Sequence, residues 1–404
     1  MGSMIHLAVG RLEIDWGKNH GFTDHSALFQ GEADVQQVAY YYAGDERDDG
    51  TYDVVVEYKE GLSKPLHQIV DRLNLLGHTI ESARREYSYI AELNSFDEKS
   101  FPFEKLQSAL AAVDVASLSP DYGEGGEDFG KFFRRQIAPR LNLQTTDWNA
   151  ELGMENISAA TILQLLANNS GARDLAVTWT FSDLEEAGWE TRDTFVRELV
   201  ASDRFLVVTE GSSDAAILGH ALHLLTPHTA DFFQFIDMEE GYPFSGTGNV
   251  VRFVQGLISI GILNRVIVLF DNDAEGVASL RRCQAMNLPD NMRVLKLPNL
   301  AEFSAFPTLG PSGSTIADIN ERAASIECYL DLGGKADVRW TNFNAETQQY
   351  QGSLVDKRSA MQAFLKQRKR SSTYNYSKLS AVLKLLTDAA SAMREAELKV
   401  EFET

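Results

Sequence analysis

The stretch that decides the fold is FLVVTEGSSDAAIL, residues 205–218. The unbroken apolar run at its start is typical of a strand that is covered on both faces, as in a parallel sheet flanked by helices. Glu210 ends the run, Gly211 suggests a sharp turn, and Asp214 lies where a helix cap is expected ahead of an apolar helix. The segment therefore predicts a strand-to-helix crossover of an α/β domain.

A second stretch, RVIVLFDNDAEG at residues 265–276, repeats this design with Asp271 and Asp273 after the strand. The carboxyl ends of parallel strands meet at one edge of a sheet, so we expect Glu210, Asp271 and Asp273 to share a pocket. Like charges at close range raise each other's pKa unless a cation lies among them. Oxygen ligands without a nearby His or Cys favour Mg²⁺ or Mn²⁺.

Either acidic cluster alone is explained equally well by the acids that are common at strand ends and helix caps. Together, E-G-x-S-D after one buried strand and D-x-D-x-x-G after the next resemble the Toprim domain, which topoisomerases, bacterial primases, small ribonucleases and OLD-family nucleases share. The resemblance covers about residues 203–335. It implies catalytic and metal-binding roles for Glu210, Asp271 and Asp273, and Asp214 lies where OLD-like members place a further acid.

The stretch GSTIADINERAASIECYLDL, residues 313–332, is expected to form an amphipathic helix. Its S-I-E-x-Y-L portion is similar to segments of defence-associated Toprim proteins, which makes Glu327 a further candidate metal ligand. A glutamate on a helix surface explains this residue equally well.

The length of 404 residues predicts two or three folded units, and an apolar fraction of 44% is typical of globular proteins. We expect an α/β fold, namely a Toprim domain with a Rossmann-like parallel sheet flanked by helices, an N-terminal α+β domain and a C-terminal helical extension. The expected segments are an α+β domain over 4–120, a mainly helical connection over 121–200, the Toprim domain over 201–335, and a hairpin with helices over 336–404.

Within these segments, alternating apolar residues predict strands in IHLAVGRLEIDW, VQQVAYYYA and YDVVVEY near the N-terminus. Helical spacing begins after Pro65. A glycine-rich loop is expected over 121–130, with a helix over 129–141.

The N-terminal segment resembles the domain that precedes HEPN or Toprim units in bacterial defence proteins. Arg72 and His78 have a spacing loosely like that of the catalytic pair of HEPN ribonucleases. Gly77 before His78 indicates a helix end, however, and Leu73 replaces the polar residue that usually follows the family arginine. Whether the two residues form a second active site stays open.

The net charge of −21 argues against non-specific adhesion to nucleic acid over the whole surface, so such a contact would have to be local. The best candidate is LKQRKRSSTYNYSK, residues 365–378, in which basic residues could neutralise phosphates and tyrosines could stack on unpaired bases. A solvated basic linker is the alternative. The candidate nucleic-acid-binding residues are Lys366, Arg368, Lys369, Arg370, Tyr374 and Tyr376.

No stretch approaches the ~18 apolar residues that a membrane span requires, and no export signal is evident at the N-terminus. We therefore expect a cytoplasmic protein with no membrane partner. Met1-Gly2-Ser3 is typical of residues left by cloning, which places the expected natural start at Met4. The only cysteines, Cys283 and Cys328, are too few for a disulfide framework or a cysteine-based zinc site.

These observations predict an Mg²⁺- or Mn²⁺-dependent endonuclease that cleaves phosphodiester bonds of DNA or RNA, as an antiphage defence or toxin effector. The alternative is a non-catalytic Toprim-fold module that regulates or binds a partner in a defence complex. A primase would need a zinc ribbon, and a topoisomerase would need a catalytic tyrosine domain. A second defence-system protein and a homo-oligomer stay open as partners.

Overall fold

The computed structural model describes residues 2–118, 156–236, 247–334 and 336–403, apart from 49, 51 and 100. Between 119 and 155 it describes 130, 133, 134, 138, 139 and 154, so the loop expected over 121–130 and the helix expected over 129–141 lie largely outside the described residues. The chain divides into two compact units. Unit 1 consists of Met1–Leu199 and Glu395–Thr404, and unit 2 of Val200–Arg394.

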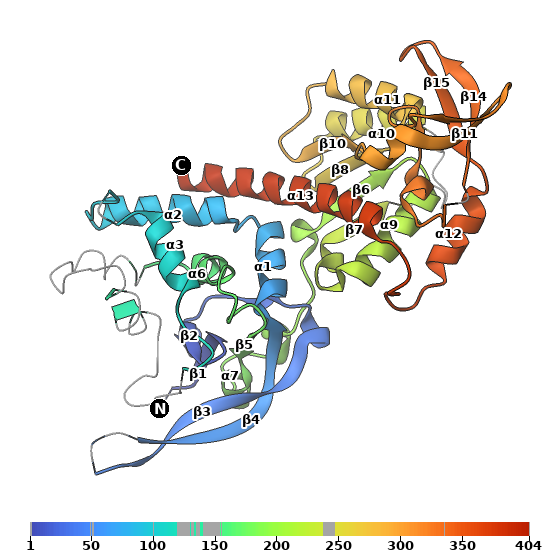
Figure 1. Ribbon diagram of the computed structural model, residues 1–404. Coiled ribbons are helices and arrows are strands. Elements are labelled where there is room, and N and C mark those ends of the chain that lie inside the picture. The colour runs from blue at the N-terminus through green and yellow to red at the C-terminus, as the bar shows by residue number, and fades with distance from the viewer. Residues whose placement is uncertain are drawn as a thin grey trace. The chain divides into compact units, whose positions relative to one another are not determined.

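Unit 1 is built on a five-stranded antiparallel sheet in the order β2-β1-β5-β4-β3 (Figure 1). The strands predicted near the N-terminus are confirmed, and the alternation of apolar residues puts Ile5, Leu7 and Val9 of β1 in the core. The strands are β1 (Met4–Val9), β2 (Leu12–Lys18), β3 (Val35–Glu46), β4 (Tyr52–Pro65) and β5 (Ala176–Thr180).

Three helices of unit 1, α1, α2 and α3, pack around α6. The side chains of α6 from Thr161 to Leu166 are all buried, because neighbouring elements surround this helix. The described helices of unit 1 are α1 (Leu66–Leu75), α2 (Ile80–Leu93), α3 (Phe103–Ala111), α6 (Ala159–Leu166), α7 (Ser182–Glu186) and α8 (Arg192–Phe195), with the 3-10 helices η1 (Ser26–Leu28) and η2 (Gly31–Asp34).

Unit 2 contains the predicted parallel sheet, with four strands in the order β10-β8-β6-β7. After a short 3-10 helix, η4 (Ala201–Asp203), the chain runs through β6 (Phe205–Thr209), α9 (Ser212–Leu225), η5 (Pro227–Phe232), β7 (Phe233–Ile236), α10 (Thr247–Ile260), β8 (Arg265–Phe270), α11 (Ala274–Gln284) and β10 (Met292–Lys296). The crossover from β6 leads to β7 on one side of β6. The crossovers from β7 to β8 and from β8 to β10 lead to the other side. The order therefore reverses between β6 and β8, which is where ligands bind in open α/β sheets.

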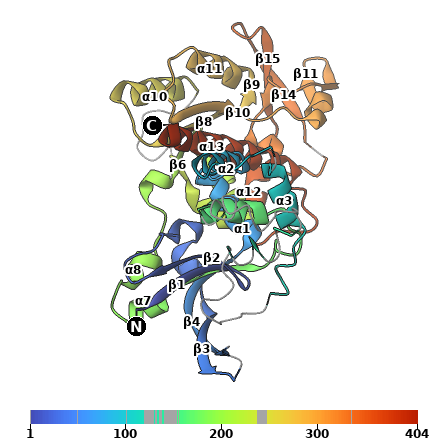
Figure 2. The ribbon, with the colours of Figure 1, turned by 90° about the vertical axis from the view of Figure 1, so that its left-hand side faces the viewer.

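The direction of the crossovers places the helices on both faces of this sheet, because each crossover is right-handed. α10 and α11 lie together on one face, over β8 and β10 (Figure 2). Val254, Val268 and Cys283 are part of their shared apolar core. α9 contacts β6 and β7 and packs on α12 (Lys357–Leu365). The prediction of a parallel sheet flanked by helices is confirmed.

A second, four-stranded sheet of unit 2 has the order β12-β11-β14-β15. Its strands are β11 (Phe306–Gly310), which follows η6 (Ala301–Ala305), β12 (Gly313–Ala317), β14 (Val338–Asn344) and β15 (Gln349–Leu354). β14 and β15 form the predicted hairpin, and the long α13 (Ser377–Glu403) follows α12. No helix in the described parts of the chain is long and apolar enough to cross a membrane.

The helix predicted over 313–332 is wrong. Gly313, with φ of +105°, begins β12, which pairs with β11 in a hairpin. Asp318 then accepts a 2.9 Å hydrogen bond from the Asn320 N–H, and Glu321 has a φ of +60°, so the chain turns where a helix would have to continue. The two-residue strands β13 (Ala323–Ala324) and β9 (Asn272–Asp273) pair instead, and η7 (Ile326–Tyr329) follows. Tertiary pairing therefore overrides the apparent helical periodicity.

Candidate active site

Glu210 and Asp271 lie next to each other at the carboxyl ends of β6 and β8. The Asp271 backbone N–H donates a hydrogen bond of 3.0 Å to Glu210 Oε1. β6 and β8 are adjacent parallel strands whose register pairs Thr209 with Leu269, so both chains leave the sheet at the same level. The order reversal of the sheet thus brings a carboxylate from each strand to one place.

Asp214 is held in the first turn of α9 and is only 9% exposed. Its Oδ2 accepts a hydrogen bond of 3.0 Å from the Gly211 N–H, and this contact fixes the start of the helix. Gly211 itself has an extended backbone, with φ of −150° and ψ of 167°, which other residues also adopt. The chain bends at Glu210 and Gly211, as expected, but this backbone conformation does not require a glycine.

The loop after β8 is anchored by Asn272, which is fully buried between the two aspartates. Its Oδ1 accepts hydrogen bonds from Lys296 Nζ at 2.9 Å and from the Glu321 N–H at 3.0 Å. Because side chains alternate along an extended chain, Asp271 and Asp273 point away from this anchor. The sequence motif did not single out Asn272, because it shows no requirement for a particular side chain between the two aspartates.

Asp273 caps α11, since its Oδ1 accepts a hydrogen bond of 2.7 Å from the Gly276 N–H. Its Oδ2 accepts a longer one, of 3.5 Å, from Gln351 Nε2 of β15. A Cβ atom on Gly276 would collide with the backbone carbonyl oxygen of Asp271. The last position of D-x-D-x-x-G therefore requires glycine for a close approach of two backbone segments.

The η7 segment brings Glu327 to the same region. The Ile326 N–H donates to Asp271 Oδ1 at 3.1 Å, which ties η7 to the end of β8. Glu327 is 6% exposed, and its Oε2 accepts a hydrogen bond of 2.7 Å from Ser325 Oγ. Glu327 is thus buried in a 3-10 helix, which excludes the alternative of a glutamate on a helix surface.

Lys357, at the start of α12, is the charged residue of this region that the sequence did not single out. Its Nζ lies 3.5 Å from Glu327 Oε2, and its side chain is 38% exposed. Burial lowers the pKa of Lys357, but the charges of Glu327, Asp271 and Asp214 outweigh burial, so its pKa is raised. No motif could have indicated this residue, because it lies about thirty positions after Glu327 in a different element.

The acids of this cluster disfavour each other's ionisation. Burial and then the charge of Glu327 raise the pKa of Asp214 to about 7. Burial raises the pKa of Asp271 well above its usual range, and the charges of Asp214 and Glu210 add to this effect. Burial also raises the pKa of Asp273. One ammonium group, that of Lys357, lowers all three values without compensating the cluster.

The donor set fits a hard divalent cation in chemistry and in charge, because it consists of carboxylate oxygens and the pKa values of Asp214, Asp271 and Asp273 are raised. In the described residues, however, no group of three or more His, Cys, Asp or Glu side chains already has the geometry to hold a metal ion. The hydrogen bonds above explain this, since backbone N–H groups and Ser325 now hold oxygens that a cation would need.

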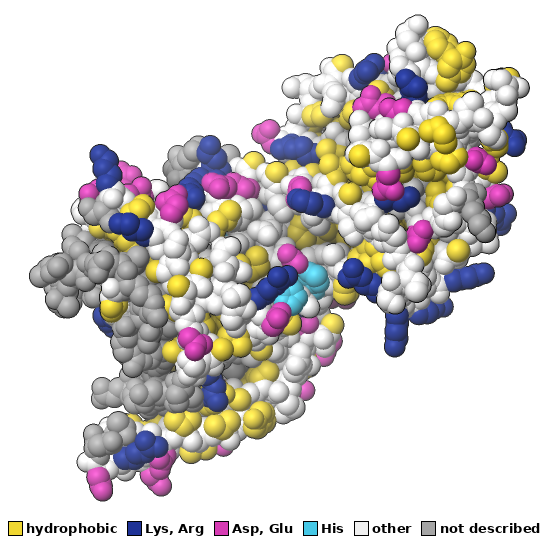
Figure 3. Space-filling view, viewed as in Figure 1, with side chains coloured by type: hydrophobic (Ala, Val, Ile, Leu, Met, Phe, Trp, Pro, Cys, Tyr) yellow, Lys and Arg dark blue, Asp and Glu magenta, His cyan; other side chains and the backbone are white. Residues whose placement is uncertain are grey.

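The basic residues predicted to contact nucleic acid lie between α12 and α13, at the surface of unit 2. Lys366, Arg368, Lys369 and Arg370 are exposed. Lys and Arg side chains project from the surface around this connection (Figure 3). The four cations are thus available to a polyanion.

The two tyrosines of this segment have structural contacts. Their rings pack on each other at 4.6 Å, and Tyr376 is buried. Tyr374 Oη accepts a hydrogen bond from the Asp331 N–H at 3.0 Å, and Tyr376 Oη donates one to Gln367 at 2.5 Å. These contacts stabilise the connection and leave the rings little surface on which a base could stack.

In unit 1, Arg72 is fully buried and bonds to the backbone. Its Nη2 donates to the carbonyl oxygens of Phe29 at 2.8 Å and Ala27 at 3.0 Å. These contacts give Arg72 a structural role in holding η1 against α1. His78 follows the end of α1, beyond Gly77 with its φ of +90°.

Comparison with known proteins identifies the N-terminal half of the chain. Residues 1–202 match the family described as HEPN/Toprim N-terminal domain 1. No curated protein and no solved structure matches the chain. The match ends close to Leu199, where the first part of unit 1 ends. With half of its residues matched, the chain belongs to the HEPN/Toprim N-terminal domain 1 family.

Proposed function

We propose that the chain is a metal-dependent Toprim endonuclease, with residues 201–335 as its catalytic domain. The observation that carries the proposal is the hydrogen bond from the Asp271 N–H to Glu210 Oε1. It brings acids from two strands together at the reversal of a parallel sheet, where α/β domains bind ligands. The family of unit 1 supports the proposal, because its description pairs this domain with HEPN and Toprim units.

The acids proposed to hold Mg²⁺ or Mn²⁺ are Glu210, Asp214, Asp271, Asp273 and Glu327. A divalent cation bound there would supply Lewis-acid activation of the scissile phosphate and of a water molecule. A dense group of buried acids with raised pKa values is costly without a counter-charge, and clusters of this kind are characteristic of functional sites. To bind the cation, the carboxylates would exchange their present N–H and hydroxyl donors for it.

The chain's own groups would orient the substrate and move protons. Glu210 lies at the edge of the cluster, where it would hold the cation or exchange a proton with water. Lys357 is the lysine of the described residues whose ammonium group lies next to these acids. It would attract a phosphate oxygen of the substrate toward the carboxyl ends of β6 and β8.

Substrate contact away from the acids would come from Lys366, Arg368, Lys369 and Arg370. A chain with a net charge of −21 repels nucleic acid over most of its surface, so a local group of exposed cations is needed to hold a strand. The structural contacts of Tyr374 and Tyr376 restrict this contribution to phosphate neutralisation. The substrate would be a phosphodiester of DNA or RNA.

We place this activity in the cytoplasm, in antiviral defence or as a toxin effector. The family of unit 1 supports this setting, since its name links the domain to HEPN and Toprim units. A second defence-system protein or a further copy of the chain would provide the trigger that orders the acids for metal binding.

The test compares the wild-type chain with a double variant, Asp271→Asn and Asp273→Asn. Plasmid DNA, single-stranded DNA and tRNA are incubated with each protein in Mn²⁺ and in EDTA. We expect cleavage by the wild type in Mn²⁺ alone and none by the variant. Asp388→Asn, a change at an exposed position of α13, is the matched control and should cleave like the wild type. Metal-dependent cleavage by a correctly folded double variant would refute the assignment.

A non-catalytic module is the second candidate, and Lys357 favours it. The ammonium group near Glu327 partly balances the acids without any metal ion. If this is the function, Mn²⁺ will not raise the thermal stability of unit 2, and no nucleic acid will be cleaved even when a partner protein is bound.

A further inference from the structure

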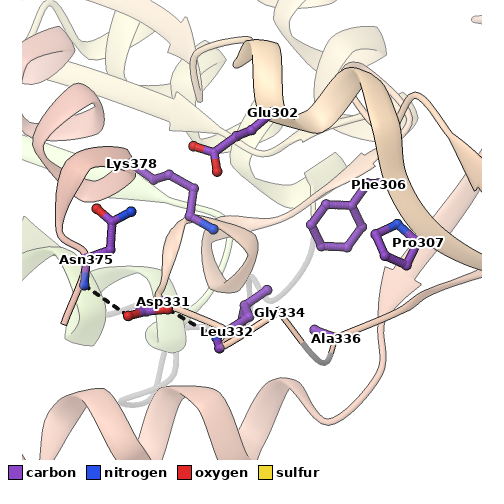
Figure 4. Close-up of a pocket in the computed structure, with 10 residues that line it drawn as sticks. Glu302, Phe306, Pro307, Asp331, Leu332, Gly334, Ala336, Asn375 and Lys378 are labelled. Atoms are coloured by element: carbon purple, nitrogen blue, oxygen red, sulfur yellow. Dashed lines mark hydrogen bonds between the residues drawn. The ribbon is translucent and has the colours of Figure 1, made fainter. Parts of the chain in front are cut away.

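A second site lies on unit 2, in a pocket of about 200 Å³ between η6, β11, residues 331–334 and 336, and the start of α13 (Figure 4). Its volume is below the ~300–1,000 Å³ of pockets for drug-sized ligands, so it offers room for one planar ring system. The residues that give it chemical character are Glu302, Phe306, Pro307, Asp331, Asn375 and Lys378.

Lys378 is the unusual residue of this pocket. It is only 8% exposed, and among the described residues its ammonium group makes no hydrogen bond and no ion pair. Its closest aromatic contact is the Phe303 ring, 5.6 Å from Nζ. Lys378 also lies in the first turn of α13, where the helix dipole disfavours a positive charge.

This placement is costly to the fold. Burial lowers the pKa of Lys378, although the charges of Glu302 and Asp331 act in the opposite direction. A buried cation without a hydrogen-bond acceptor is rare unless a ligand supplies one. No acceptor among the described residues of the pocket is bonded to this ammonium group, so the occupant should bring one.

The remaining lining residues restrict the occupant further. Asp331 is ionised, since N–H groups of Asn375 and Gly333 donate to its carboxylate at 2.9 and 3.1 Å and lower its pKa. Glu302 adds a second carboxylate, which disfavours a phosphate or another anion. Lys378 in turn disfavours a cationic ligand.

A neutral ring that carries a hydrogen-bond acceptor next to hydrogen-bond donors could bond to both the ammonium group and the carboxylate. Figure 4 shows the Glu302 carboxylate and the Lys378 ammonium on one side of the space, with Phe306 and Pro307 on the other. A ring stacked on Phe306 and Pro307 would present its edge to both charges. Among nucleobases, guanine matches best, because its O6 or N7 accepts from a lysine and its N1–H and N2–H₂ donate to a carboxylate.

We propose that this pocket binds one unstacked guanine of a single-stranded nucleic acid, with Lys378 and Glu302 reading its edge and Phe306 stacking on its face. The assignment rests on the proposed function, for which it defines a base preference. Nucleic-acid enzymes commonly read an extruded base by edge hydrogen bonds and stacking. In this protein the base would be read by residues separate from the acids that cleave.

The test uses the full-length protein and fluorescent oligothymidylates that carry one central guanine, hypoxanthine, adenine or abasic site. Affinities are measured by anisotropy in EDTA, so that no cleavage occurs. We expect the guanine oligonucleotide to bind about tenfold more tightly than the adenine or abasic ones, as one specific base contact allows. Hypoxanthine, which lacks the N2 donors, should bind with intermediate affinity.

Lys378→Met removes the ammonium group and keeps most of the stem, and it should abolish the guanine preference. Glu302→Gln should remove the difference between guanine and hypoxanthine. Lys384→Met is the matched control, because Lys384 lies exposed on the same helix and pairs with Asp388. Thermal unfolding verifies that each variant is folded.

Equal affinity of the wild type for all four oligonucleotides, or no binding of any, overturns the assignment, as does a guanine preference that survives in folded Lys378→Met. These outcomes differ from a failure of the nuclease proposal. A wild type that cleaves in Mn²⁺ without a guanine preference refutes the pocket alone, and one that prefers guanine without cleaving in Mn²⁺ refutes the nuclease alone.

Discussion

Replacing Asp214 with Asn should stabilise the metal-free protein at neutral and alkaline pH. In the folded chain, burial and Glu327 raise the pKa of Asp214 from 3.8 to about 7. In the unfolded chain the same carboxyl ionises near 3.8. Between these values the folded state binds more protons than the unfolded state, so the free energy of unfolding decreases as the pH rises through this window.

The magnitude follows from the two pKa values. A tenfold change in proton affinity is worth about 1.4 kcal/mol, so the change from 3.8 to about 7 corresponds to a loss of about 4 kcal/mol above the window. This is an upper bound, because Asp271 also has a raised pKa and the two carboxyl groups repel each other. An Asn side chain keeps an oxygen for the Gly211 N–H, which lies 3.0 Å from the present carboxylate, and loses only the charge.

The assay is urea unfolding in EDTA at about pH 5 and about pH 8. Unfolding is monitored by the hydrogen exchange of peptides from β6 and β8, so that the measurement reports on unit 2 alone. The wild type should lose up to about 2.7 kcal/mol between the two conditions, because only about two of the three pH units of the window lie above pH 5, and Asp214→Asn should lose much less. Asp388→Asn, at an exposed position, should behave like the wild type. Saturating Mn²⁺ should restore the wild type at the higher pH, by about 2.7 kcal/mol at a concentration 100 times the Kd. An Asn variant that is no more stable than the wild type at about pH 8 would refute the electrostatic reasoning.

Three further results are expected. Gly276→Ala should lower the stability of unit 2 by about 1–3 kcal/mol and should also lower any cleavage, because the new Cβ displaces Asp271. Thermal unfolding and cleavage assays measure the two effects. Gly256→Ala on α10, where a Cβ meets no atom, should change neither. Lys357→Met removes the cation beside the acids and should tighten Mn²⁺ binding by about tenfold, which a Mn²⁺ titration of the unfolding temperature measures. The exposed cations of the α12–α13 connection are Lys366, Arg368, Lys369 and Arg370. Replacing them with Gln should reduce the slope of log binding constant against log salt concentration for single strands by up to about 0.7 per residue. Anisotropy at several salt concentrations measures this slope.

The sequence predicted the parallel sheet because its signals are local. An unbroken apolar run that ends in an acid and a glycine specifies a buried strand and its crossover without reference to distant residues. For the same reason, the proximity of Glu210 and Asp271 followed from the rule that parallel strands end at one edge, and a hydrogen bond of 3.0 Å now joins the two residues. Their role in metal binding and catalysis stays a prediction.

The remainder could not be predicted, because it depends on contacts between distant segments. The apolar residues at 313–332 have helical spacing, yet pairing of β11 with β12 and of β9 with β13 decides their conformation. Lys357 and Asn272 carry no motif, and their roles appear only once α12 and the loop after β8 are in place. In the sequence, Tyr374 and Tyr376 have the pattern of residues that stack on bases. In the structure, their hydroxyl groups make hydrogen bonds with Asp331 and Gln367.

The η7 segment connects the acids to the pocket beside Lys378. Its first residue, Ile326, donates to Asp271, and its last, Tyr329, contacts Asn272 through the hydroxyl group at 3.3 Å. The ring of Tyr329 packs edge-on against Phe303 at 5.0 Å, and Phe303 is the ring that the Lys378 ammonium faces. A base that drew Lys378 into the pocket would alter its contact with Phe303, and the contacts above lead from Phe303 through η7 to the loop that carries Asp271 and Asp273. In the two proposals, base recognition and the arrangement of the acids would both involve this short segment, so the two sites are best tested by separate readouts, one without metal and one with it.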